Sequence, residues 1–140
     1  MKRTLITLAS AGLMLFGTTA IMQAAPQDRD SSWYQERETF YHGEGWHMHM
    51  FQRVRDDLDH VQTSIFRGGD EYRIARTKEE LNDLQSDLAA HRYQQPKLDE
   101  VIGSLQRVVA DNRLTPRDRD VLSDDLSRLR DYREHHANWR

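Results

Sequence analysis

Apolar residues recur at helical spacing through the second two-thirds of the chain. The first such stretch carries Phe51, Val54, Leu58, Val61 and Ile65, at alternating intervals of three and four residues. This spacing lines one face of an amphipathic α-helix. The same rhythm predicts helices over about 46–67, 71–92, 96–111 and 116–136. No stretch shows the alternation of a strand, so we predict an all-α fold class: an antiparallel four-helix bundle or helical hairpins with short loops, in a single domain over 46–140.

Glycine, proline and threonine mark the ends of the predicted helices. Gly68-Gly69 favours a helix end, because glycine readily adopts the left-handed conformation needed there. Pro96 suits the first turn of the helix predicted over 96–111, because the N–H that proline lacks would have no partner there. The clearest start lies at Thr115-Pro116, with Asp118 placed to complete a capping box.

Several polar residues interrupt or flank the apolar faces. Thr77 and His91 fill two steps of the apolar face of 71–92. The paired carboxylates Asp56-Asp57 and Asp124-Asp125 fall on polar faces, where we expect them to be solvated charge. Gly103 lies among the polar positions of 96–111, and a glycine inside a helix costs about 1 kcal/mol relative to alanine.

Residues 26–45 form an aromatic and histidine-rich arm or linker in this interpretation. Trp33, Phe40 and Tyr41 fit one side of a short helix, which Gly43 and Gly45 would break. The alternative is a semi-ordered arm whose aromatic side chains dock on the helical domain.

Residues 1–25 have the layout of a secretory signal peptide. Lys2 and Arg3 precede an uncharged run from Leu5 to Met22, and small residues follow at Ala24-Ala25. The sequence therefore predicts export to the periplasm or secretion, with no stable membrane span after cleavage. Removing residues 1–25 takes two cations from a formal net charge of -3 and leaves -5. That balance does not favour nucleic acid as a partner.

The chain of 140 residues has no cysteine, so no disulfide or lipid-modified cysteine contributes. The fold must rest on its apolar core. None of the common nucleophile, zinc-protease or phosphate-loop motifs occurs, which indicates a protein that is not an enzyme and needs no cofactor.

One segment has the composition of a metal site. Imidazole with thioether ligands suits copper, and imidazole with carboxylate suits zinc or nickel. On one helix, His47 and His49 would point about 200° apart, so sharing an ion requires extended backbone. The candidate ligands are His42, Glu44, His47, Met48, His49 and Met50.

The segment Leu114-Thr115-Pro116-Arg117-Asp118 resembles the Leu-Thr-x-x-Gln motif of the Spy and CpxP family of periplasmic chaperones. In that family the motif begins a helix of a bent hairpin, and dimers form a cradle for unfolded clients. Asp118 stands where the family has glutamine. The resemblance implies a chaperone-like or partner-binding role.

Two functions follow from these patterns. The first is an exported, non-enzymatic protein-binding, chaperone-like or structural factor of the cell envelope, which binds a protein partner or self-associates as a homodimer. The alternative is a periplasmic protein that binds copper, zinc or nickel through residues 42–50. For the first function, the expected contact residues are Trp33, Tyr34, Phe40, Tyr41 and Trp46.

Overall fold

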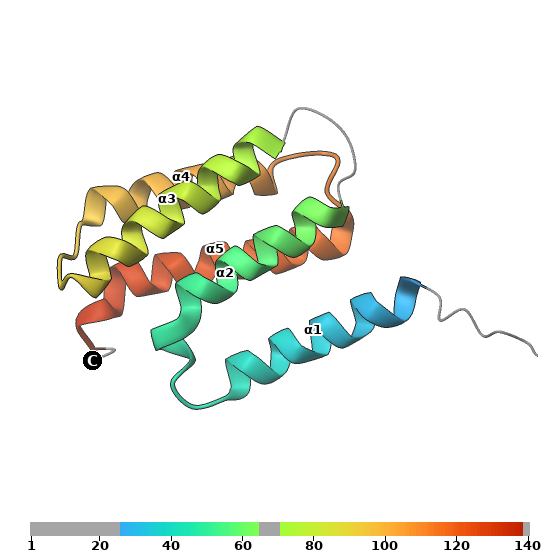
Figure 1. Ribbon diagram of the computed structural model, residues 1–140, viewed down its shortest axis with the longest axis horizontal. Coiled ribbons are helices and arrows are strands. Elements are labelled where there is room, and N and C mark those ends of the chain that lie inside the picture. Colours follow the sequence, from blue (N-terminus) through green and yellow to red (C-terminus); the bar gives the residue numbers. More distant parts are fainter. Residues whose placement is uncertain (1–25, 65–70, 139–140) are drawn as a thin grey trace, which may run out of the picture. The chain divides into compact units, whose positions relative to one another are not determined.

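The computed structural model describes residues 26–64 and 71–138, and every element in these ranges is helical (Figure 1). The all-α fold class is confirmed. The signal peptide predicted for residues 1–25 and the helix end predicted at Gly68-Gly69 lie outside the described residues. The elements are α1 (Pro26–His42), α2 (Trp46–Ser64), α3 (Glu71–Ala89), α4 (Gln95–Val109), α5 (Pro116–His135) and the short 3-10 helix η1 (His136–Asn138).

The chain divides into two compact units, Met1–Glu38 and Thr39–Arg140. The described part of the first unit, residues 26–38, belongs to α1, in which Trp33 and Tyr34 pack edge to face with ring centroids 4.7 Å apart. The segment predicted as an arm or linker is thus helical as far as His42. No glycine or second proline interrupts residues 27–42, and the break falls where Gly45 takes a φ of +76°.

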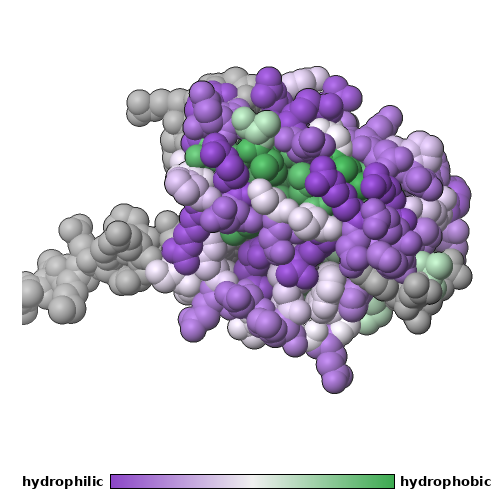
Figure 2. Space-filling view, turned by 180° about the vertical axis from the view of Figure 1, so that it is seen from behind, coloured by the Kyte–Doolittle hydropathy of each residue, from purple (hydrophilic) through white to green (hydrophobic). Residues whose placement is uncertain are grey.

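Helices α2 to α5 pack against one another in a ring. Helix α2 packs against α3 and α5, and α4 packs against the same two helices. The observed starts and ends agree closely with the predicted ranges; α3 ends at Ala89, three residues before the predicted end. The face shown in Figure 2 is largely hydrophilic and carries one apolar patch.

The core of the second unit is built from the apolar faces that the spacing predicts. Met50, Leu58, Leu105 and Leu129 are fully buried, and Trp46 packs against the core from its edge. Helix α4 packs against both α3 and α5, which cover its apolar face. Its buried residues are Leu98, Val101, Ile102, Ser104, Leu105 and Val108.

The start of α5 confirms the predicted cap. The Thr115 hydroxyl oxygen accepts a hydrogen bond from the Asp118 backbone N–H at 3.1 Å, and Pro116 is the first helical residue. The Asp118 carboxylate accepts hydrogen bonds from the hydroxyls of Thr115, at 2.7 Å, and Ser64, at 3.2 Å. This buried carboxylate therefore links the start of α5 to the end of α2.

The expectation that the paired carboxylates face water is wrong for one member of each pair. Asp57 and Asp125 are fully buried. Asp57 lies 2.8 Å from Arg53 Nε, and Asp125 accepts a hydrogen bond from the Tyr41 hydroxyl at 3.2 Å. Helix α2 contacts α3 on one side and α5 on the other, so its buried arc is wider than a single apolar stripe.

Thr77 is fully buried, as predicted, and its hydroxyl donates to the Arg73 carbonyl at 2.8 Å. His91 does not lie on the apolar face of α3, because the helix has already ended.

None of the helices in residues 26–64 and 71–138 combines the length and apolar character needed to cross a bilayer.

Gly103 yields the first testable prediction. A Cβ added there meets one side-chain atom, Arg107 Nη1, at the ordinary contact distance of 3.9 Å. Gly103→Ala therefore adds no clash and removes backbone freedom from the unfolded chain. We expect it to raise the free energy of unfolding by about 0.5–1 kcal/mol. Urea unfolding followed by circular dichroism measures the change.

The matched control is Ala75→Gly, at an exposed position inside α3. It should lower the free energy of unfolding by a similar amount, about 1 kcal/mol. A lower free energy of unfolding for Gly103→Ala than for the wild type would contradict the claim that a methyl group fits at this position.

Candidate functional site

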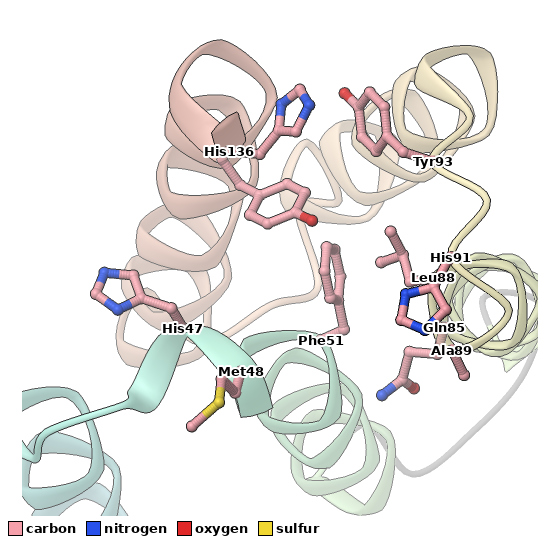
Figure 3. A pocket seen from close by; sticks show the side chains of 10 residues that line it. His47, Met48, Phe51, Gln85, Leu88, Ala89, His91, Tyr93 and His136 are labelled. Atoms are coloured by element: carbon pink, nitrogen blue, oxygen red, sulfur yellow. The ribbon is translucent and has the colours of Figure 1, made fainter. Parts of the chain in front are cut away.

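An open pocket of about 950 Å³ lies at one end of the second unit, where α2 begins and α3 and α5 end (Figure 3). Its size is within the range of small-ligand sites in proteins. Its lining residues are His47, Met48, Phe51, Gln85, Leu88, Ala89, His91, Tyr93, Tyr132 and His136.

Apolar and aromatic side chains form the body of the pocket. Phe51 of α2 and Tyr132 of α5 pack edge to face with ring centroids 5.0 Å apart. Tyr93 comes from the loop between α3 and α4, and the centroid of its ring lies 6.4 Å from that of Tyr132. Leu88 and Ala89 come from the last turn of α3. Aromatic pairs in these geometries hold one another in place, so the wall is pre-formed.

The end of α3 places His91 in an unusual backbone conformation. The His91 N–H donates to the Leu88 carbonyl at 2.9 Å, and the Arg92 N–H donates to the Asp87 carbonyl at 2.8 Å. These two bonds make a Schellman turn, whose left-handed position is usually occupied by glycine. His91 occupies that position with a φ of 56°. A side chain there strains the backbone.

The Asp87 carboxylate holds the loop between α3 and α4 in place through hydrogen bonds. It accepts hydrogen bonds from Arg92 Nη2 at 2.8 Å, from Gln94 Nε2 at 3.0 Å and from Lys97 Nζ. Asp87 is 5% exposed. Three donors on residues 92–97 thus converge on one buried carboxylate. This network joins the end of α3 to the start of α4 and sets the path of the loop that carries His91 and Tyr93.

Tyr93 and His136 form the far wall of the pocket. Their rings stack with centroids 4.0 Å apart and planes at 27°. The Tyr93 hydroxyl and His136 Nδ1 are both buried, and neither has a hydrogen-bond partner among the described residues. Burial, assisted by the charge of Asp99, raises the pKa of the Tyr93 hydroxyl above its usual value.

The polar groups of the lining are neutral side chains that can both donate and accept hydrogen bonds. None of the lining residues is Asp, Glu, Lys or Arg. The pocket therefore presents imidazole, phenol and amide groups beside an apolar floor. Such a lining suits an occupant with an apolar body and a polar group at one end.

Three of the aromatic residues predicted to bind a partner, Phe40, Tyr41 and Trp46, make packing contacts within the second unit. The Arg128 guanidinium lies over the Tyr41 ring at 3.7 Å and over the Trp46 ring at 5.1 Å. Phe40 packs edge to face on Tyr41 and has Arg53 5.9 Å above its ring. These contacts tie Phe40 and Tyr41, at the end of α1, to α2 and α5. Trp33 and Tyr34 belong to the first unit.

The predicted metal ligands do not converge. Within residues 26–64 and 71–138 there is no group of three or more His, Cys, Asp or Glu residues that could hold a metal ion. Because α2 begins at Trp46, His47 and His49 lie on a helix, the geometry that separates them. His47 stacks on Trp46 at 3.9 Å, and Met50 is fully buried in the core. The others are exposed: His42, Glu44, His49 and Met48.

Sequence reasoning did not identify the pocket. Phe51 carries the helical spacing that predicts the core, and it is only 6% exposed. Tyr93 and His136 lie outside the α-helices, where periodicity carries no information. A weak signal was present in His91, since a histidine just after a helix end stands where glycine is usual.

Asp87 yields a pH-dependent prediction. Hydrogen bonds from Lys97 and Arg92 hold the pKa of the Asp87 carboxyl below its usual range. A group with a lowered folded-state pKa stabilises the fold fully above its unfolded pKa, and the contribution is lost as the pH falls through the folded value. We expect Asp87→Asn to be less stable than the wild type near neutral pH, with a difference that shrinks below about pH 4.

Urea unfolding between acidic and neutral pH measures this difference. Asp83→Asn, an exposed carboxylate of the same helix, is the matched control and should leave the free energy of unfolding nearly unchanged across the range. A gap between wild type and Asp87→Asn that stays constant down to strongly acidic pH would refute the role given to the Asp87 carboxylate.

Comparisons with known proteins give no relative from which a function can be transferred. The chain matches no protein-family model, and neither the curated proteins nor the solved structures contain a match to it. The functional argument therefore rests on the pocket.

Proposed function

We propose that this chain is a non-enzymatic helical factor of the cell envelope that binds other proteins, in a chaperone-like or structural role. The observation that carries the proposal is the open pocket at the end of the second unit, with its apolar floor of Phe51, Leu88 and Ala89. An apolar side chain of a partner would fill it and remove this surface from water.

The character of the surrounding surface supports protein binding. The face drawn in Figure 2 is largely hydrophilic. Against a surface of that character, a pocket lined by Phe51, Leu88 and Ala89 is a candidate binding site. At the mouth, Met48 is 79% exposed. A flexible thioether suits a surface that adapts to different partners.

The cellular setting is part of the proposal. The charge and apolar pattern of residues 1–25 favour export, so the periplasm or the exterior is the expected location. The likeness of Leu114-Thr115 to the helix-start motif of the Spy and CpxP chaperones is consistent with a client-binding role. The partner is another protein or a second copy of the chain, with Trp33 and Tyr34 as further contact candidates.

Filling the pocket tests this function. Ala89 lines the pocket and is exposed, so Ala89→Trp places an indole in the opening without disturbing the core. Ala90→Trp adds the same side chain one residue later, outside the lining. Both variants should keep the helical circular dichroism spectrum of the wild type.

We expect wild-type protein and Ala90→Trp to slow the aggregation of heat-unfolded malate dehydrogenase, measured by light scattering. Ala89→Trp should lose most of that effect. The loss corresponds to about tenfold weaker client binding, or about 1.4 kcal/mol. Equal suppression of aggregation by the two variants would show that the pocket does not bind the client. If the wild-type protein does not suppress aggregation at all, the proposed chaperone-like role is wrong.

A further inference from the structure

Another open groove, of about 450 Å³, is lined by the neighbouring helices α3 and α4 (Figure 1). It shares no residue with the pocket described above. Arg76 and Glu80 form the α3 side, and they neutralise each other in an ion pair of 2.8 Å. The lining residues on α4 are Pro96, Asp99, Glu100, Gly103, Ser104 and Arg107. The charge that the groove offers to a partner therefore comes from α4.

Gly103 is the residue of this groove that the fold of one chain does not explain. A glycine inside a helix is destabilising relative to alanine. At this position a Cβ would meet only Arg107 Nη1, at 3.9 Å, so a side chain has room. Glycine is used where a backbone must come close to a ligand or to another chain. The α4 surface at Gly103 is therefore low enough for a second helix to cross it closely.

The charged residues of this α4 face are sorted by sign around Gly103. Asp99 and Glu100 precede it by four and three residues, and Arg107 follows it by four. Residues at these intervals share one face of a helix. Glu100 and Arg107 are exposed, and no described residue forms an ion pair with either of them. Arg107 instead donates a hydrogen bond to the Ser104 hydroxyl at 3.0 Å. Both charges are thus available to a partner.

We propose that this face of α4 is the contact surface of a homodimer, in which the α4 helices of two copies cross at Gly103 in antiparallel directions. A two-fold axis there places each residue opposite the one that lies equally far on the other side of the glycine. The acidic side of each copy then faces the basic side of the other, and Glu100 meets Arg107 at two equivalent contacts. Asp99 adds negative charge to the same side, although Arg133 of α5 already holds it at 3.1 Å.

Charge complementarity favours a second copy over a different partner. A partner that carries one sign of charge would match only half of this face, whereas a second copy matches both halves. The ion pairs lie at the surface, where each contributes little and salt screens it. We therefore expect a weak dimer, with a dissociation constant on the order of 100 µM at low salt and higher as salt is added.

Sedimentation velocity over a series of protein concentrations at low salt measures the dissociation constant. We expect Arg107→Glu and Glu100→Arg each to weaken the dimer about tenfold or more, because each change places like charges opposite one another at both contacts. An equimolar mixture of the two variants should dimerise as tightly as the wild type, since the two reversals together restore opposite charges. Asp56→Arg is the matched control, at an exposed position of α2, which does not contact α4, and should leave the constant unchanged.

The variant Gly103→Ala separates association from folding. It adds one methyl group per copy at the point where the two helices cross, so the dissociation constant of the dimer should rise severalfold. Urea unfolding at a protein concentration well below that constant should still show a monomer at least as stable as the wild type, because the methyl group fits within one chain.

Four results would overturn the inference. Wild-type protein that stays monomeric up to about 1 mM at low salt forms no such dimer. A dimer that persists in both charge reversals uses another surface. If the mixture of the two reversals stays monomeric, their charges do not meet across an interface. An unchanged dissociation constant in Gly103→Ala shows that the helices do not cross at this glycine. The aggregation test of Ala89→Trp does not use this surface, so the proposed function stands or fails separately.

Discussion

The buried carboxylate of Asp87 is the constraint on which the pocket end of the domain depends. Hydrogen bonds from Arg92, Gln94 and Lys97 reach it across the turn between α3 and α4. A carboxylate that is 5% exposed is tolerated only when such charged partners surround it. With this turn fixed, Tyr93 packs against Tyr132 and stacks on His136 at the end of α5.

The two ends of the helical domain differ in how well their residues suit the local backbone. At the start of α5, Thr115 caps the helix and Pro116 occupies its first position, so residue preference and structure agree. At the end of α3, a histidine takes the place of glycine, and the nearby Tyr93 and His136 bury polar atoms. Natural sequences depart from local preference mainly at functional or strained sites, which supports the proposal that the pocket end is the functional one.

Periodicity predicted the helices and most of the core, because the spacing of residues such as Val54, Leu58 and Val61 reports the buried face directly. It failed for Asp57 and Asp125, since a sequence pattern treats a carboxylate as solvated and cannot see a second packing surface. For residues 26–42 the sequence left a short helix and a semi-ordered arm as alternatives, because no continuous apolar stripe runs along that segment, and the structure shows the helix. The pocket could not be predicted, because its lining comes from turns and helix ends that meet only in the folded chain.

Methyl NMR of the protein with an unfolded client tests the central claim most directly. Met48, Leu88 and Ala89 carry methyl groups in the pocket, while Met50 and Leu105 carry them in the buried core. The account predicts that adding client shifts the first group and leaves the second nearly unchanged. Shifts spread evenly over both groups, or pocket signals that do not move while client is bound, would contradict the assignment of function to this pocket.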